Sequence, residues 1–297
     1  MAVHHTVPQF FLRNFAVDEA KNRITTVAKH GAMAIWAERS IQSIGYERDF
    51  YVHMNGDIPV SVEADINRRI ETPISQSDTW AKITTGRTDA LDKSDRPILY
   101  ALIRHLEVRT PHYQSTADEV IQMAGNPNSD TPFTDEERAF YASLRRDKDA
   151  AKAMLNYMAT KAAWTASDFK GSGIAILRSP IAVRSSTVPV LPMRVSAHPA
   201  IKLPLPGMTP YQRVLTLNPT TIACLNPGDF DGEFLNQPIN EKTALAFNRR
   251  FVEQFAEFAN VRHLITGRED LATDMTWAPY AIVKEDRRTM TFRQQQS

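Results

Sequence analysis

The chain has 297 residues, of which 42% are hydrophobic and 23% are charged. These values are typical of a globular protein and exclude wholesale disorder, and the length accommodates one large domain or two closely packed ones. A formal net charge of +1 excludes a global charge excess that would favour a polyanion, although it is compatible with a local basic patch. The one cysteine, Cys224, excludes an internal disulfide, and its apolar flanks predict an inert thiol in a buried strand.

Signals for targeting are not visible in the sequence. The N-terminus has no charged segment followed by the apolar run of a secretory signal, and no stretch of about 18 or more apolar residues is present. We therefore expect a cytoplasmic protein with no membrane partner. Nothing in the sequence indicates an oligomeric state.

The first sixty residues are predicted to be rich in β-structure. A β-branched run at residues 24–28 predicts a strand, and residues 33–36 predict its partner after a turn at Gly31. A further extended segment at 49–52 leads to a turn at 55–57, where Asn, Gly and Asp follow one another. This part of the chain is therefore expected to contain hairpins.

Two amphipathic helices are predicted next. Apolar residues recur at every fourth position from Val62 to Ile74, which places them on one face of a helix. A second helix is predicted to begin after Asp95, a natural N-cap, and to end at Thr110 before a proline. The predicted buried face of the second helix consists of Leu99, Leu102, Ile103 and Leu106.

Residues 124–135 are predicted to form a surface loop. Thr134 and Glu137 then have the spacing of a capping box, which predicts the start of another helix. We expect this helix to run toward Trp164, with a break near residues 147–149.

From Gly171 onward short strands are predicted, because prolines are concentrated between residues 180 and 238. The predicted strands lie at residues 173–177, 181–183, 213–217 and 221–225. Asn240 is predicted to cap a helix that extends to about residue 260, and the polar tail from about Glu285 is expected to be frayed. The predicted inner face of that helix consists of Ala244, Phe247, Phe251 and Phe255. The fold class is thus α+β, with a helix-rich first half, an N-terminal β-hairpin segment, and a mixed short-stranded sheet in the second half.

The N-terminal segment, residues 4–15, combines a histidine pair with a proline and an aromatic run. Its sequence is His4-His5-Thr6-Val7-Pro8-Gln9-Phe10-Phe11-Leu12-Arg13-Asn14-Phe15. A fully buried Phe contributes about 1.5–3 kcal/mol, so several together outweigh the fraying of a terminus. We therefore predict that this segment is buried.

This opening motif resembles the start of DUF4238, a large and mostly bacterial family known only as a domain of unknown function. Weaker similarities follow at Asp49-Phe50-Tyr51, Val62-Glu63, Ile70-Glu71, Val108-Arg109-Thr110-Pro111 and Leu245-Ala246-Phe247-Asn248. The resemblance implies a single domain over residues 1–297, with subdomains at 1–165 and 166–297, and it specifies almost no chemistry. Family members often carry a Ser-Asp-Asn-Pro-like turn, whereas this chain has Arg178-Ser179-Pro180 there and lacks the acid.

The histidine pair supports two interpretations. In the first, one imidazole binds a single divalent metal (Mg²⁺, Mn²⁺ or Zn²⁺) and the other exchanges a proton with water or a leaving group. The His-His-x-x-Pro spacing is also similar to the start of some His-Me finger nucleases. The predicted metal ligands are His4, Glu63 and Glu71. The predicted catalytic residues are His5 as general base, its partner His4, and the phosphate contacts Arg104 and Arg109. This interpretation predicts a metal-assisted hydrolase of phosphodiesters, with nucleic acid as partner.

In the second interpretation the motif is structural, and the protein is a non-catalytic binding or regulatory module. Glu63, Asn67 and Glu71 form one row of a helix, whose carboxylates would pair with a basic residue. The candidate partners are Arg13, Arg104 and Arg109. Both interpretations predict an imidazole of the pair close to polar side chains of the two helices, because partly desolvated imidazoles need partners. Whether the protein is an enzyme stays open at this point.

Overall fold

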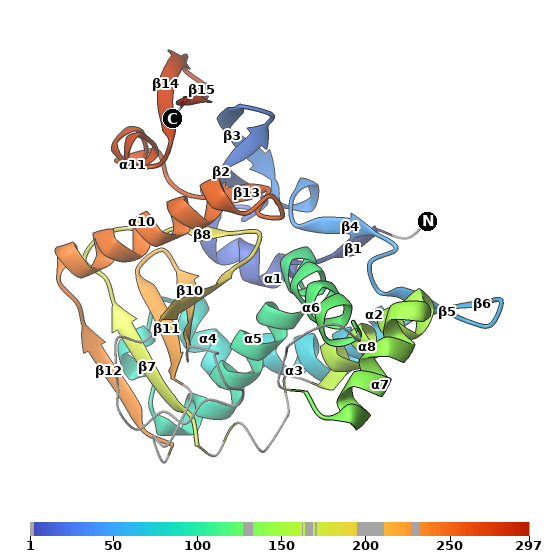
Figure 1. Ribbon diagram of the computed structural model, residues 1–297. Coiled ribbons are helices and arrows are strands. Elements are labelled where there is room, and N and C mark those ends of the chain that lie inside the picture. The colour runs from blue at the N-terminus through green and yellow to red at the C-terminus, as the bar shows by residue number, and fades with distance from the viewer. Residues whose placement is uncertain are drawn as a thin grey trace.

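The computed structural model describes residues 3–126, 133–161, 163, 169, 171–194, 211–226 and 232–296. Residues 127–132 of the loop predicted at 124–135, and Trp164, lie outside these residues. Two larger β-sheets, two short strand pairs and a set of helices make up the described chain, which confirms the predicted α+β class (Figure 1). Among the described residues, no helix combines the length and apolar character that a membrane span requires.

The larger sheet has six antiparallel strands in the order β14-β15-β3-β2-β13-β8. Its strands are β2 (Arg23–His30), β3 (Met33–Ser40), β8 (Ser185–Ser186), β13 (His263–Ile265), β14 (Tyr280–Glu285) and β15 (Thr289–Gln294). The predicted hairpin at 24–36 is its centre. Strands from both halves of the sequence therefore pair in one sheet.

The second sheet has five strands in the order β12-β7-β11-β10-β9, with only the β12–β7 pair parallel among the pairs described. Its strands are β7 (Gly173–Arg178), β9 (Val190–Arg194), β10 (Tyr211–Asn218), β11 (Thr221–Asn226) and β12 (Phe234–Pro238). Cys224 lies buried in β11 as predicted, and burial raises the pKa of its thiol to about 12. At neutral pH the thiol is therefore protonated and unreactive.

Two strand pairs complete the β-structure. β1 (Val3–His5) pairs with β4 (Tyr46–Arg48), and β5 (Val52–Asn55) pairs with β6 (Ile58–Ser61). The β5–β6 hairpin projects from the body of the protein (Figure 1). Its turn is the predicted Asn-Gly-Asp segment, in which Gly56 has a φ of 61°.

The helices of the first half follow β6. They are α2 (Glu63–Ile66), the π-helical segment η3 (Asn67–Glu71), α3 (Thr72–Ser75), α4 (Asp78–Thr84), α5 (Arg96–Val108), α6 (Pro111–Ala124), α7 (Asp135–Arg146) and α8 (Lys148–Lys161). The four-residue apolar repeat is confirmed, because Ile66, Ile70 and Ile74 are fully buried along α2–η3–α3. All four residues predicted to form the inner face of α5 are also fully buried, in the core between α5 and the five-stranded sheet.

Thr110 has a second role that the sequence analysis did not anticipate. The predicted end of α5 is correct, but the Thr110 hydroxyl accepts a hydrogen bond from the Tyr113 N–H and caps α6, with Pro111 in the first turn. The capping box of Thr134 and Glu137 is confirmed at the start of α7. The predicted break lies at Asp147, between α7 and α8.

In the second half, Asn240 caps α10 (Glu241–Glu257), whose predicted inner face is buried, and α11 (Leu271–Trp277) follows. Two predictions were wrong here. Residues 181–183 are not a strand, since the paired strands lie further along as β8 and β9. The tail is not frayed, because Met290 and Phe292 alternate with polar residues and bury one face of β15 against β3.

The N-terminal segment is buried as predicted. After β1 it forms α1 (Gln9–Leu12) and the 3₁₀ turn η1 (Arg13–Phe15). Val7, Phe11 and Leu12 are fully buried, and they join the core that α5 shares with the five-stranded sheet. Phe10 is half-buried and packs edge-on against Trp80, with ring centroids 5.0 Å apart. The start of the chain is therefore part of the main core.

Candidate functional site

The histidine pair lies on β1, which is held against β4. His4 is opposite Glu47 and His5 is opposite Tyr46 in the strand pair. Gly45 lies just before β4. Its carbonyl accepts hydrogen bonds from the N–H groups of Thr6, at 2.7 Å, and Val7, at 3.1 Å. Gly45 has a φ of 61°, and a Cβ there would lie 3.0 Å from the Cβ of Val7. Glycine is therefore required for this close approach.

His4 is almost completely buried and uses both ring nitrogens. Nδ1 accepts a hydrogen bond from the backbone N–H of Tyr51 at 3.0 Å, and Nε2 lies 3.4 Å from Oε2 of Glu63. Because Nδ1 is the acceptor, the neutral ring carries its proton on Nε2, directed at the carboxylate. The predicted contact between the pair and the first helix is thus confirmed.

His5 is half-buried beside the same network. Its Nε2 lies 2.8 Å from Nε2 of Gln9, and its ring meets Tyr46 edge-on with centroids 6.4 Å apart. Burial and the nearby Arg109 guanidinium lower the pKa of His5, although Glu63 and Glu71 oppose this effect. His5 is therefore predominantly neutral at pH 7.

Arg109 is the centre of the network. Its guanidinium donates hydrogen bonds to the Glu71 carboxylate and to the backbone carbonyl of His5, and it lies 2.7 Å from Nε2 of His105. It also covers the ring of Tyr51 at 5.5 Å from the centroid. Arg109 thus ties β1 to both η3 and α5.

The pKa values of this buried group show that its charges are compensated. Burial disfavours ionisation of Glu71, but Arg109 and His105 outweigh this effect and lower the pKa of Glu71 to about 2. Burial and Arg109 lower the pKa of His105 to about 4. At neutral pH the group is a carboxylate and a guanidinium beside a neutral imidazole. We call the set His4, His5, Tyr51, Glu63, Glu71, His105 and Arg109 the N-terminal network.

Arg104 and Arg13 do not join the N-terminal network. Arg104 binds Glu107, which also accepts a hydrogen bond from Arg213 of β10 at 2.7 Å. Arg104 and Arg109 are five residues apart, which is about 140° around a helix, so they face different neighbours. Arg13 is exposed. The structure therefore groups Arg109 with the histidine pair and separates Arg104 from it.

Tyr51 is a member of the network that the sequence did not assign to the site. His105 belongs with Arg104 and Arg109 to a basic cluster that the sequence places at the end of α5, and its position four residues before Arg109 puts the two side chains on one face. Tyr51 reaches the network through its backbone N–H and its ring, neither of which leaves a pattern in the sequence.

The predicted metal ligands do not form a set that fits a metal ion. Across the described parts of the chain, no three His, Cys, Asp or Glu side chains are grouped as ligands. The acceptor nitrogen of His4 is occupied by the Tyr51 N–H, and Glu71 is held by Arg109 and His105. His4 and Glu71 would each have to give up a present partner before they could bind a metal.

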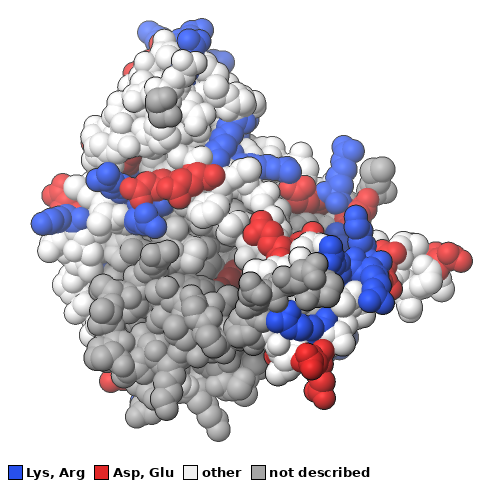
Figure 2. Space-filling view, viewed as in Figure 1, with Lys and Arg blue, Asp and Glu red and all other residues white. Residues whose placement is uncertain are grey.

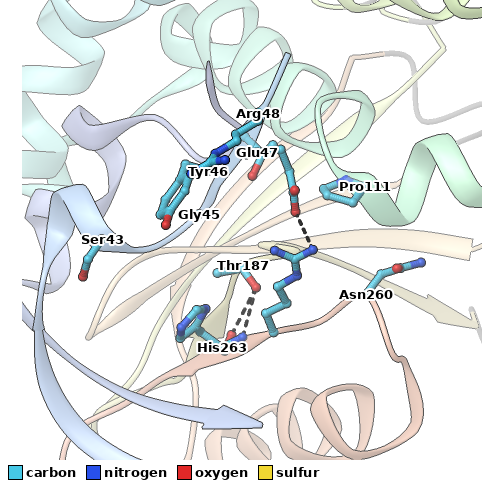
Figure 3. A pocket seen from close by; sticks show the side chains of 11 residues that line it. Ser43, Gly45, Tyr46, Glu47, Arg48, Pro111, Thr187, Asn260 and His263 are labelled. Carbon is cyan, nitrogen blue, oxygen red and sulfur yellow. Dashed lines mark hydrogen bonds and ion pairs between the residues drawn. The ribbon is translucent and has the colours of Figure 1, made fainter. Parts of the chain in front are cut away.

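A pocket of about 360 Å³ lies beside β4 (Figure 3). Tyr46, Glu47 and Gly45 line one side, while His263 and Thr187 line the other. Glu47 forms an ion pair with Arg262 at 2.9 Å. Thr187 donates to and accepts from the backbone of His263, which fixes this wall.

A second pocket of about 870 Å³ adjoins the first. The two pockets share four lining residues, which are Glu47, Arg48, Pro111 and Arg262. The second pocket continues between β4 and the helices α6, α7 and α8, where Arg145, Lys148 and Lys152 line it. Figure 2 shows Lys and Arg side chains gathered over this helical part of the molecule. We call the two pockets together the basic cleft.

The charges of the basic cleft are not balanced. Five Lys or Arg side chains line it, and Glu47 and Asp118 are its acidic residues among those described. Neither Arg48 nor Lys148 has an acidic partner within the described chain. Unpaired cations at a concave surface attract anions and raise their local concentration.

Comparisons with known proteins give a family and no function. No curated protein and no solved structure matches the chain. A family model described as a protein of unknown function, DUF4238, matches residues 3–184, which include β1, the N-terminal network and most of the lining of the cleft. The similarity predicted at residues 245–248 lies beyond the matched part. Because the match covers more than half of its length, the chain belongs to the DUF4238 family.

Proposed function

We propose that this protein binds a phosphate-bearing polymer, with nucleic acid as the candidate, in the basic cleft. The observation that carries the proposal is the excess of basic side chains in two connected pockets, given a chain whose net charge is only +1. Contacts to phosphates supply most of the affinity of nucleic-acid-binding proteins, and they need cations along a groove.

The arrangement of the cations supports an extended ligand. Arg48 comes from β4, Arg145 from α7, and Lys148 and Lys152 from α8, so they lie along the walls of the second pocket. Arg145 is oriented by a hydrogen bond to Gln122 at 3.1 Å. Successive phosphates of a strand would meet successive cations on this path.

In this proposal the N-terminal network supports the cleft and performs no chemistry. β1 pairs with β4 along its length, and β4 supplies Glu47 and Arg48 to both pockets. Arg109 and His4 fix β1 to the helices through buried hydrogen bonds and ion pairs. The motif that opens the chain therefore determines where the wall of the cleft lies.

The proposal is tested by fluorescence anisotropy with short labelled oligonucleotides, single-stranded and duplex, between about 50 and 200 mM salt. The logarithm of the association constant should fall linearly with the logarithm of the salt concentration, with a slope of about −0.7 per phosphate contact for a single strand. The double variant Arg48→Gln/Lys148→Gln should bind more weakly and have a slope smaller by about 1–2.

The matched control is Arg287→Gln/Arg288→Gln, which removes the same charge from the exposed β14–β15 turn. Equal weakening in the control and the cleft variant would show a non-specific charge effect and contradict the proposal. So would the absence of binding at the lowest salt concentration.

A second proposal is hydrolysis of a phosphodiester, in which a divalent metal would have to displace the present partners of His4 and Glu71. One observation favours it: His5 is only half-buried and is neutral at pH 7, which is the state a general base needs. Incubation of oligonucleotides with the protein and Mg²⁺, Mn²⁺ or Zn²⁺ tests it. Cleavage that is lost in His5→Gln would support hydrolysis, and intact oligonucleotides with all three metals would contradict it.

A further inference from the structure

We propose that the smaller pocket of the basic cleft is a phosphomonoester site, which holds the terminal phosphate of the bound strand. This inference rests on the proposed function for the identity of the ligand. The residues that would form the site are His263 and Arg262, which line the pocket. Arg39 of β3 is not part of the lining and acts on His263 through its charge. His263 begins β13 and Arg262 precedes it, far from the N-terminal network in the sequence.

The register of the six-stranded sheet places basic side chains on one face. His263 is opposite Ala28 of β2, and His30 is two residues further along that strand. Arg39 is opposite Ile24, which is four residues before Ala28. Residues separated by two or four along a strand share a face, as do directly paired residues. His263, His30 and Arg39 therefore project from the same face, and His263 lines the pocket.

Two polar atoms in this group are buried and lack a hydrogen-bond partner in the described chain. They are Nδ1 of His263 and Nε of Arg39. Most buried polar side-chain atoms in proteins have a partner, so such atoms call for an explanation. Arg39 Nε is a donor only, and a neutral imidazole can donate from one nitrogen. A ligand rich in acceptor oxygens in the pocket that His263 lines would accept from its free ring nitrogen.

The electrostatics of His263 agree with an anion site. Burial is the main cause that lowers the pKa of His263 to about 4, and Arg39, Arg262 and His30 lower it further. No carboxylate among the described residues opposes them. Glu47 is the acidic residue in the described lining of this pocket, and it is already paired with Arg262. The pocket therefore has a cationic surplus around a neutral histidine.

The size and position of the pocket favour a phosphomonoester as the ligand. A terminal phosphate has three unesterified oxygens and up to two charges, so it can accept from several donors at once and pair with more than one cation. The pocket holds about 360 Å³ and opens into the second pocket through Arg48 and Arg262. A strand that lies along α7 and α8 would thus reach this pocket with its end.

The experiment compares oligonucleotides of one sequence that end in either a phosphate or a hydroxyl, with the label at the opposite end. We expect the phosphorylated strand to bind about tenfold more tightly, which is the effect of one charge-assisted contact of about 1.4 kcal/mol. His263→Gln should remove this preference, and Arg39→Gln, which removes a nearby positive charge, should weaken it. Arg39 forms no hydrogen bond with the described chain, so its variant should fold even if His263→Gln does not.

A second measurement does not depend on the polymer. NMR titration of the His263 imidazole in the presence of inorganic phosphate should show a raised pKa, because a nearby anion favours the imidazolium. Arg287→Gln, in the exposed β14–β15 turn, is the control and should retain both the end preference and the phosphate effect.

The outcomes separate this inference from the proposed function. If both strands bind equally and phosphate leaves the pKa of His263 unchanged, the phosphomonoester site is wrong, while binding of the hydroxyl-ended strand still supports the cleft. If phosphate raises the pKa of His263 but neither strand binds, the pocket is an anion site and the proposed polymer function is wrong.

Discussion

The N-terminal network and the basic cleft differ in how their charges are partnered. In the network, Arg109 meets Glu71 and His4 meets Glu63, and all four groups are at least partly buried. In the cleft, Arg48 and Lys148 have no acidic partner in the described chain. Compensated charges are typical of a scaffold, while uncompensated ones at a concave surface are typical of a binding site. Under the proposed function, the histidine motif that opens the sequence supports the cleft, and Arg48 and Lys148 contact the ligand.

The largest expected effect concerns the N-terminal segment itself. Deletion of residues 1–15 should leave the protein unfolded or aggregated, because Val7, Phe11 and Leu12 are fully buried and each contributes about 1.5–3 kcal/mol to a total stability of about 5–15 kcal/mol. Circular dichroism and thermal melting measure this. Phe11→Ala alone should cost about 3–5 kcal/mol, and half-buried Phe10 should cost less. An unchanged melting temperature of the truncated protein would refute the claim.

Loss of the central cation is expected to have the next largest effect. Arg109→Gln leaves the Glu71 carboxylate buried without its ion-pair partner, and it should lower the free energy of unfolding by about 3–5 kcal/mol. Urea denaturation measures the change. Arg68→Gln is the control, because it removes an exposed ion pair with Asp65 and should cost less than about 1 kcal/mol. Similar small losses in both variants would mean that the network does not hold the fold together.

The network also predicts a pH dependence of stability. His105 has a folded-state pKa of about 4, below the ordinary value of 6.5, so between these pH values the unfolded chain binds a proton that the folded chain does not. The full free energy of unfolding should therefore be present above about pH 6.5 and should decrease as pH falls toward 4. The expected loss between pH 7 and pH 5 is about 2 kcal/mol. Urea denaturation at both pH values should show a smaller difference for His105→Gln than for the wild type.

In the same experiment His30→Gln is the control, because His30 is exposed. It should retain the wild-type difference between pH 7 and pH 5. A His105→Gln variant with the wild-type pH dependence would show that another group is responsible.

The smallest predicted effect concerns His5. Glu63 raises the pKa of His5 against the larger opposing effects of burial and Arg109, so Glu63→Gln should lower this pKa further. NMR titration of the His5 ring measures the direction of the change. Glu19→Gln, an exposed residue, should leave the pKa unchanged. A raised pKa in Glu63→Gln would contradict the arrangement of charges described above.

Local patterns in the sequence predicted many of the elements. The four-residue repeat around Ile70, the capping box at Thr134 and the N-cap at Asn240 all depend on neighbours within a few turns, and all are confirmed. β15 was missed because its pattern of two buried residues is short, and its partner β3 lies about 250 positions earlier. Pairing over such a distance leaves no local signal.

The same contrast between local and long-range contacts applies to the candidate site. The contact of His4 with Glu63 was predicted, since a desolvated imidazole next to a helix with carboxylates needs such a partner. The face shared by Arg39 and His263 was not predicted, because it arises only when β13 pairs with β2. The separation of Arg104 from Arg109 follows from helix geometry and was available from their spacing.

The central claim is that the network supports the cleft and that the cleft binds the ligand. The most direct measurement is the Kd of a labelled oligonucleotide for Glu63→Gln and for Arg48→Gln/Lys148→Gln, with the free energy of unfolding of each variant determined in parallel. We predict that Glu63→Gln loses stability and keeps a Kd close to that of the wild type, while the cleft variant keeps its stability and has a Kd at least about tenfold higher. The opposite result, with binding lost in Glu63→Gln and retained in the cleft variant, would contradict the account.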